Sequence, residues 1–342
     1  MKMSRSHPAT AVAIALLIAG GLSAPAAAQT IVWNDNVFGP PRALTKGMEA
    51  MVEHYKRASG GKFEIKIAYG SALGPEKQTP EAIKAGGYEA GMMCVGYYPN
   101  KFPLLSVMEL PFLVPARTAA HAKVYEAVLH HPLIEKEMAQ RWNMKYFGPV
   151  FLPPYEFMGN KRIASVADMK GVKMRISGLN AKALQVFGAV PTMVTAPEGY
   201  TALERGTIDS FGFPYSYAFG AYKMYEVSKY VTEGMEMGGF LCFQGVSLSA
   251  WNKLPANLQA ELPKAQALAA VVMIQAFKDA DAKWIPIFKQ KLEVVPFPAA
   301  ERAKLASGAS KIWEGWVKEQ EAAGRPGREI LNFVKAESAK YK

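Results

Sequence analysis

The chain has 342 residues, of which 50% are hydrophobic, and its formal net charge is +11. This length and composition fit a globular protein of two domains with a sizeable core. The Lys and Arg residues are dispersed, so the charge gives no sign of a nucleic-acid-binding tract and only weak support for an anionic ligand.

The N-terminus has the pattern of a cleaved secretory signal. Lys2 and Arg5 precede the apolar run Ala11–Ala19, and Ala26–Ala28 form a small-residue cleavage site. The apolar run is too short for a membrane span, and no later stretch reaches about 18 residues without a charge or a breaker. We therefore predict a signal peptide over residues 1–28 and a mature protein in a bacterial periplasm.

Short strands and helices alternate after this signal. The expected strands are Ile31–Trp33, Phe63–Ala68 and Gly91–Val95, and the expected helices are Arg42–Ala58 and Pro80–Ala85. This βαβαβ unit indicates a parallel sheet, in which ligands bind beyond the carboxyl ends of the strands. Phe38 follows the first strand and Tyr97 the third, so both are candidate cleft residues, although rings in such loops usually pack within the fold.

The next segment leads the chain into a second expected domain. A helix over Thr118–Ala139 and a strand over Lys145–Phe151 precede Pro153–Pro154, where we expect the chain to cross. The strand Tyr155–Met158 then opens the second domain, and the chain returns near Met235–Phe240. Short, repeated crossings of this kind predict a hinge between the domains.

The stretch from Val166 to Tyr217 repeats the β-α-β-α-β rhythm. Its expected elements are strands at Lys173–Ile176, Thr192–Val194 and Ile208–Phe213, a helix around Leu184 and a helix at Glu198–Arg205. Arg175 lies near the end of the first of these strands, and Phe213 and Tyr215 lie at the end of the third. An arginine at a strand end forms either an ion pair within the fold or a bidentate clamp on a carboxylate ligand.

The C-terminal third predicts a strand, a long helical region and a final helix. These elements are the strand Leu241–Leu248, the helical region Leu254–Leu292 broken or bent at Pro263 and Pro286, the strand Glu293–Phe297 and the amphipathic helix Ala299–Ala323.

Signatures of catalysis and metal binding are missing from the sequence. There is no nucleophile elbow, phosphate-binding loop or metalloprotease motif, and the five histidines lack metal-ligand spacing. We expect no cofactor, no metal and no enzymatic activity. Cys94 and Cys242 lie in apolar strand-like runs, where a disulfide and two buried thiols are both open.

Five blocks of sequence resemble the substrate-binding subunit of tripartite ATP-independent periplasmic (TRAP) transporters. They occur in the family's order over nearly the whole mature chain: Gly70–Glu76 (GSALGPE), Glu109–Leu113 (ELPFL), Asp168–Ile176 (DMKGVKMRI), Ala202–Asp209 (ALERGTID) and Tyr225–Thr232 (YEVSKYVT). The resemblance implies an α/β periplasmic-binding-protein fold of two domains, with a hinge and a long helix that spans both. Domain I would comprise residues 29–152 with 241–280, and domain II residues 153–240 with 281–342.

The resemblance also implies a mechanism. Arg175 matches the family arginine that holds the ligand's carboxylate in a closing cleft, and the closed protein would deliver a small organic acid to TRAP membrane permease subunits. Glu76 matches a glutamate near the cleft, where it would act on the ligand or on Arg175, although an exposed loop carboxylate fits equally well.

Two departures from the family bear on the ligand. Tyr155 stands where sialic-acid-binding members have a second arginine, and Phe213 stands where many members have an asparagine. Together with Tyr215, Tyr217 and Phe243 near the expected edge of the cleft, these rings favour an aromatic or other monocarboxylate, unless they only pack the core. The alternatives are a C4-dicarboxylate or 2-oxo acid receptor, a binding protein for an ATP-driven importer or a sensor, a secreted enzyme, and a structural or adhesive protein.

Overall fold

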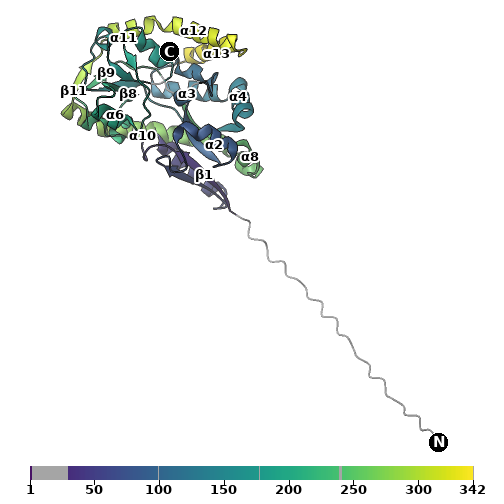
Figure 1. The fold of residues 1–342 in the computed structure, drawn as a ribbon. Coiled ribbons are helices and arrows are strands. Elements are labelled where there is room, and N and C mark those ends of the chain that lie inside the picture. The colour runs from purple at the N-terminus through teal and green to yellow at the C-terminus, as the bar shows by residue number, and fades with distance from the viewer. Residues whose placement is uncertain (2–29, 99, 177, 239–240, 342) are drawn as a thin grey trace.

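The computed structural model describes residues 1, 30–98, 100–176, 178–238 and 241–341 (Figure 1). The predicted signal peptide lies outside the described residues, except for Met1. The chain forms two mixed sheets with helices around them, which confirms the predicted α/β class.

The first sheet has the strand order β2-β1-β3-β10-β4. Its strands are β1 (Ile31–Val37), β2 (Phe63–Tyr69), β3 (Ala90–Cys94), β4 (Met144–Val150) and β10 (Cys242–Ser247). β1 runs parallel to β2 and β3, as the opening βαβαβ pattern predicts, whereas β10 is antiparallel to both β3 and β4.

The second sheet has the strand order β11-β9-β5-β8-β6-β7. Its strands are β5 (Tyr155–Gly159), β6 (Lys173–Arg175), β7 (Val190–Pro191), β8 (Ser210–Pro214), β9 (Tyr230–Glu233) and β11 (Glu293–Pro296). β6 is parallel to β7 and β8, so the second βαβαβ prediction holds in topology. The expected strand at Thr192–Val194 is wrong in position, because β7 pairs with β6 two residues earlier.

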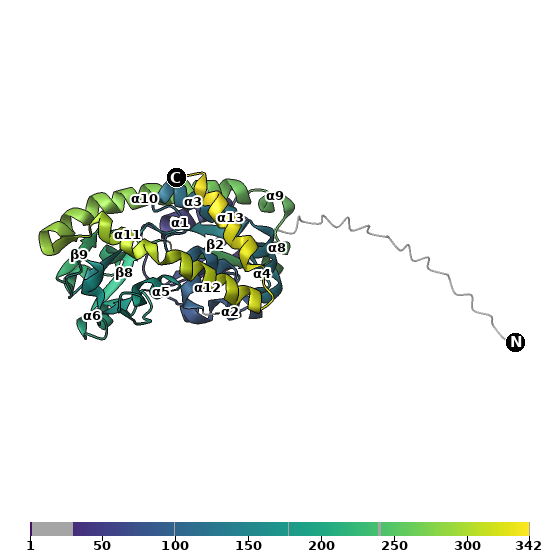
Figure 2. The same cartoon turned by 90° about the horizontal axis from the view of Figure 1, so that it is seen from above.

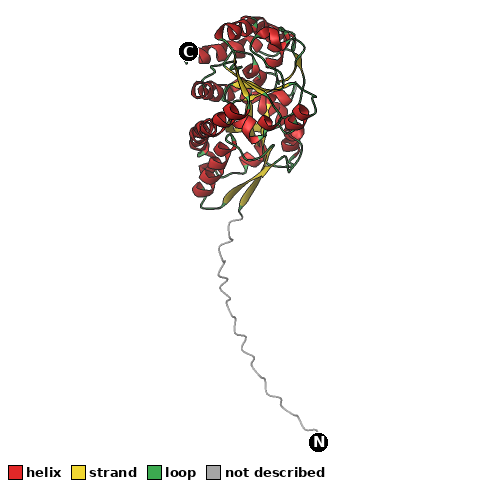
Figure 3. Ribbon diagram, turned by 90° about the vertical axis from the view of Figure 1, so that its left-hand side faces the viewer, coloured by secondary structure: helices red, strands yellow, loops and turns green. Residues whose placement is uncertain are grey.

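Helices cover both sheets from outside (Figure 3). Those of the first 260 residues are α1 (Thr45–Ala58), α2 (Thr79–Ala85), α3 (Thr118–Leu129), α4 (Pro132–Trp142), α5 (Asn180–Gln185), α6 (Gly199–Glu204), α7 (Tyr217–Ala221), α8 (Leu248–Asn252) and α9 (Ala256–Gln259). The single helix expected over Thr118–Ala139 is wrong. Pro132 starts α4 as its first residue, a position that tolerates proline because its missing N–H has no helical partner there.

The long helix α10 (Leu262–Lys291) packs against elements of both sheets (Figure 2). It contacts β4 of the first sheet and the helix α1 that packs on that sheet. It also contacts β11 of the second sheet and the helix α7 that packs on that one. Pro263 lies in its first turn, and the helix continues through Pro286, so of the expected break or bend at Pro286 the break does not occur. The family's long helix is therefore present.

The C-terminal region contains three helices, α11 (Ala299–Ser307), α12 (Ala309–Ala322) and α13 (Gly327–Ala339). The one helix expected over Ala299–Ala323 is wrong, because it is divided at Gly308. The sequence prediction also missed α13, whose Ile330, Leu331 and Val334 are buried; the helix packs against α12 and α3.

The two cysteines form a disulfide. Cys94 at the end of β3 lies opposite Cys242 at the start of β10 in the antiparallel register. The question that the sequence leaves open is thereby answered, since strand pairing brings together residues 148 positions apart.

Candidate functional site

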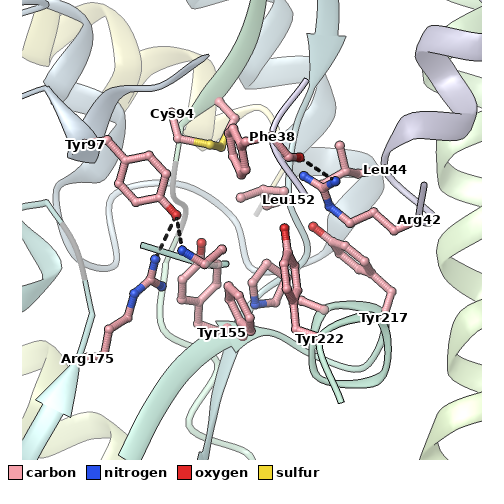
Figure 4. A pocket seen from close by; sticks show the side chains of 15 residues that line it. Phe38, Arg42, Leu44, Cys94, Tyr97, Leu152, Tyr155, Arg175, Tyr217 and Tyr222 are labelled. Carbon is pink, nitrogen blue, oxygen red and sulfur yellow. Dashed lines mark hydrogen bonds between the residues drawn. A yellow bond between two sulfur atoms is a disulfide. The ribbon is translucent and has the colours of Figure 1, made fainter. Parts of the chain in front are cut away.

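A small cavity of about 30 Å³ lies where strand ends of the two sheets face each other (Figure 4). The first sheet contributes residues that follow β1 and β3, and the second contributes residues at the ends of β5, β6 and β8. The described residues that line it are Phe38, Arg42, Leu44, Cys94, Tyr97, Leu152, Tyr155, Arg175, Ala196, Phe213, Pro214, Tyr217, Ala218, Tyr222 and Cys242. This volume is well below the range for small-molecule sites, so a bound ligand needs the two sides of the cavity to move apart.

Arg175 is 1% exposed and is held by all three nitrogens of its guanidinium. Nε donates to the Val194 carbonyl at 2.7 Å, Nη1 to the Gly212 carbonyl at 3.0 Å, and Nη2 to the Tyr97 hydroxyl at 3.0 Å. Within the described residues it forms no salt bridge, so its charge is buried without a carboxylate partner. A buried cation in this state is a strong site for an anionic ligand.

Tyr97 connects the two sides of the cavity. Its hydroxyl accepts the Arg175 hydrogen bond and a second one from the Ala196 backbone N–H at 3.0 Å. Because Tyr97 follows β3 of the first sheet and Arg175 belongs to β6 of the second, this hydroxyl fixes the guanidinium from across the cavity (Figure 4).

A second buried arginine, Arg42, lies at the other end of the cavity (Figure 4). Its Nη1 donates to the carbonyls of Phe38 at 2.9 Å and Pro40 at 2.8 Å. Its Nη2 is 4.0 Å from Met92 Sδ, which is a weak acceptor. Like Arg175, it makes no salt bridge to any described residue.

Two rows of aromatic rings run between the arginines. On the first-sheet side Tyr97 and Phe38 are 5.7 Å apart, with Arg175 5.9 Å from the Tyr97 ring and Arg42 5.3 Å from the Phe38 ring. On the other side, the Phe213 and Tyr222 rings are 5.4 Å apart; Arg175 is 5.3 Å from Phe213 and Arg42 is 5.6 Å from Tyr222. The cavity is thus a ring-walled slot with a cation at each end.

Among the described residues, the lining contains these two guanidinium groups and no carboxylate. The Tyr222 hydroxyl is fully buried and has no hydrogen-bond partner in the described part of the chain. Burial raises the pKa of Tyr222 to about 12, although the positive charge of Arg42 opposes the shift. Burial likewise raises the pKa of Tyr155 well above its usual value, so both phenols are neutral at physiological pH.

Five of the eight residues predicted from sequence line the cavity. These are Phe38, Tyr97, Tyr155, Arg175 and Phe213.

The other three lie outside it. Glu76 is in a 3-10 helix and accepts a hydrogen bond from Ser71 at 3.2 Å. Tyr215 packs on Phe219 and Phe288. Phe243 is buried against Phe102.

Arg42 and Tyr222 were not among the residues predicted from the sequence, and Tyr217 was expected only near the edge of the cleft. Arg42 was assigned to a helix, but α1 begins at Thr45 and Arg42 lies in the preceding turn, where its N–H donates to Thr45 Oγ1. Tyr217 begins α7, and Tyr222 caps its end. The sequence feature that could have indicated Tyr217 and Tyr222 is the run of aromatic residues that follows the end of β8.

The described residues contain no group of three or more His, Cys, Asp or Glu side chains placed to hold a metal ion. None of the helices described is both long and apolar enough to cross a membrane.

Residues 36–320 match the family model of the bacterial extracellular solute-binding proteins, family 7. The chain belongs to this family. The family comprises the substrate-binding subunits of TRAP transporters, so the resemblance seen in the sequence is confirmed. Its members are solute receptors, which also confirms the prediction of a binding protein over an enzyme.

Individual relatives of this TRAP receptor agree with the assignment. A solute-binding protein of Verminephrobacter eiseniae is 31% identical over 54% of the chain, and the match spans 55% of that relative's length. A C4-dicarboxylate-binding periplasmic protein of Rhodobacter capsulatus is 27% identical over 93% of the chain and 94% of its own length. In three dimensions, a TRAP solute-binding protein from an unidentified marine microbe, specific for aromatic acids and solved with 3-hydroxybenzoate, superposes with a TM-score of 0.79. It is 21% identical, over 92% of this chain and 99% of its own.

Proposed function

We propose that this TRAP receptor binds a small aromatic or otherwise apolar monocarboxylate in the ring-walled cavity, with Arg175 holding the carboxylate. The observation that carries the proposal is a fully buried guanidinium with no carboxylate partner among the described residues, at one end of an apolar slot.

The hydrogen bonds of Arg175 leave the donors that such a clamp needs. A guanidinium has five N–H groups, one on Nε and two on each terminal nitrogen. Val194, Gly212 and Tyr97 occupy one on each nitrogen, so one N–H remains on Nη1 and one on Nη2. These two donors equal the number of oxygens in a carboxylate, which a guanidinium can bind in a bidentate pair.

The walls support an apolar ligand body. Phe38, Tyr97, Phe213 and Tyr222 present ring faces and edges to the slot, and the described lining has few other polar groups. The marine relative that binds aromatic acids favours the same ligand class. A C4-dicarboxylate is the second candidate, supported by the Arg42 guanidinium and by the Rhodobacter relative.

We further propose that capture proceeds by closure of two domains, residues 29–152 with 241–280 and residues 153–240 with 281–342. The cavity lies between strand ends of the two sheets, and α10 packs against both, as a hinge-closing receptor needs. In this proposal the signal peptide is removed after Ala28 in the periplasm, and the closed receptor docks on the membrane permease subunits of its transporter.

The test is a thermal-shift assay on protein exported to a bacterial periplasm, purified, unfolded and refolded to remove bound ligand. The panel contains aromatic monocarboxylates, 2-oxo acids, C4-dicarboxylates and sugar acids. A ligand at 100 times its Kd stabilises the folded state by about 2.7 kcal/mol, which gives a clear rise in Tm. A rise with aromatic monocarboxylates supports the proposal. A rise with C4-dicarboxylates alone overturns the ligand class, and no rise with any acid overturns the carboxylate receptor.

A further inference from the structure

The end of the cavity opposite Arg175 has donors that an apolar ligand would leave unused. Both N–H groups of Arg42 Nη1 are taken by the Phe38 and Pro40 carbonyls, which fixes the plane of its guanidinium. Nε has no hydrogen-bond partner among the described residues, and Nη2 has only the distant sulfur of Met92. Arg42 is therefore anchored on one side and offers its Nε–Nη2 side to a further acceptor.

Tyr222 provides a second unused group at the same end. Its hydroxyl is fully buried and makes no hydrogen bond within the described chain, and its ring centroid is 5.6 Å from the Arg42 guanidinium carbon. A buried hydroxyl without a partner costs about 1–3 kcal/mol, so an arrangement that keeps it is costly unless something satisfies it.

Gly39 makes the close approach of these groups possible. Its φ is +70°, a backbone conformation that favours glycine, and a side chain there would run into the Tyr222 hydroxyl and come within 3.2 Å of Arg42 Nη1. The turn after β1 thus brings the guanidinium and the phenol together next to the slot.

We propose that Arg42 and Tyr222 form a second oxygen subsite, which binds a polar oxygen on the ligand's apolar body at the end remote from its carboxylate. The inference rests on the proposed function, because it takes Arg175 as the carboxylate site. The ligand class is then an aromatic carboxylate that carries a second oxygen substituent.

Either of two substituents suits this subsite. Arginine only donates, whereas a tyrosine hydroxyl donates one hydrogen bond and accepts others. A ring hydroxyl can accept from Arg42 and donate to Tyr222, and a second carboxylate can accept from both. The two aromatic rows keep a flat body in line between Arg175 and Arg42, so the substituent reaches the subsite from the meta or para position.

The experiment is isothermal titration calorimetry of the refolded receptor with benzoate, 3-hydroxybenzoate, 4-hydroxybenzoate, isophthalate and terephthalate. We expect at least one oxygenated acid to bind about ten- to one-hundredfold more tightly than benzoate, as one or two hydrogen bonds to a charged group provide. A preference for the hydroxy acids or for the diacids identifies the substituent.

Two variants test the residues themselves. Tyr222→Phe keeps the ring and removes the hydroxyl, and Arg42→Gln removes the charge; the matched controls are Tyr200→Phe in α6 and Arg57→Gln on exposed α1 surface. Each site variant should reduce the advantage of the oxygenated acid over benzoate about tenfold or more, so that the affinity for the oxygenated acid falls more than the affinity for benzoate. The controls should change neither.

Two results overturn the inference while leaving the proposed function intact: benzoate binding as tightly as every oxygenated acid, or site variants that weaken all five acids equally. If the two variants disagree, the result for Tyr222→Phe is decisive, because Arg42→Gln also removes the donor to the Phe38 and Pro40 carbonyls. If none of the acids binds the unaltered receptor, the proposed function itself fails.

Discussion

The two ends of the cavity have the same charge but differ in how their arginines are held. Arg175 is 1% exposed and all three of its nitrogens donate to protein acceptors, whereas Arg42 is 6% exposed and is fixed chiefly through Nη1. A guanidinium held through every nitrogen loses little entropy when it binds an anion. We therefore expect the Arg175 end to bind the same group in every ligand and the Arg42 end to discriminate between ligands.

The surroundings of the two ends differ as well. Arg42 and Tyr217 also border a groove along α10 that includes Asp279 and Lys283, so the Arg42 end is close to the molecular surface. Near the Arg175 end, the loop after β6 packs at Gly178 against the buried carboxyl of Glu109. Because Arg175 is the less exposed of the two arginines, we expect the stronger anion site at its end, where removal of solvent strengthens the interaction.

The largest effect is expected from Arg175→Ala. Removing one partner of a buried, hydrogen-bonded charge pair costs about 3–5 kcal/mol of binding, which is more than about a hundredfold in Kd for every acid that binds. Calorimetry measures the loss, and circular dichroism checks the fold. Arg175→Lys should also bind poorly because an ammonium lacks the fork.

Arg205→Ala, at the exposed end of α6, is the matched control and should bind normally. If both Arg175 variants keep full affinity, Arg175 does not hold the carboxylate, and the proposed contrast between the two ends of the cavity is wrong.

Glu109→Gln should remove part of the pH dependence of stability. Burial raises the pKa of Glu109 from 4.5 to about 8, while the N–H groups of Gly96 and Leu241 partly oppose the shift. Its folded pKa exceeds its unfolded pKa, so its contribution to stability is complete below pH 4.5 and is lost as pH rises to about 8. The unaltered protein should lose on the order of 2–4 kcal/mol of unfolding free energy over this window from this group.

Urea unfolding at pH 5 and pH 8 measures the difference, with the exposed Glu81→Gln as control. Buried Asp35 and Glu156 have raised pKa values too, so the slope should flatten in Glu109→Gln and not vanish. An unchanged slope contradicts the prediction.

Reduction of Cys94–Cys242 should lower stability more than affinity. The disulfide closes a chain segment of 148 residues, and removing such a link costs about 2–4 kcal/mol, because the unfolded chain gains freedom. β3 and β10 remain paired by their ladder, so Tyr97 keeps its place beside Arg175. Unfolding in urea with and without reductant tests this; equal stability in both would show that the ladder alone determines the pairing.

Much of the fold follows from local patterns. Both βαβαβ units and the position of Arg175 at a strand end could be read from alternation and turn residues, because parallel strands place their carboxyl ends at one edge. For the same reason Phe38, Tyr97 and Phe213 were candidates, whereas Tyr155 was one because it stands where some family members have a second arginine; all four line the cavity.

The remaining site residues depend on geometry that the sequence does not show. Arg42 reaches the cavity only through the positive φ of Gly39 and the carbonyls of its own turn. Tyr222 depends on where α7 begins and ends, and the disulfide depends on β10 pairing with β3. Tertiary packing determines each of these turns and strand registers.

The smallest effect is expected from Tyr215→Phe, because Tyr215 was predicted to lie in the site but is not among the residues that line the cavity. Its ring packs on Phe219 and Phe288, and its hydroxyl donates to Glu233 at 2.7 Å, away from both arginines. We expect unchanged affinity for every acid and a loss of about 1 kcal/mol of stability, the usual value of one such hydrogen bond. Tyr217→Phe is the matched comparison, because Tyr217 lines the cavity beside Arg42. If Tyr215→Phe changes ligand preference and Tyr217→Phe does not, the ligand lies along β8 toward Glu233, and the slot between the two arginines is not its site.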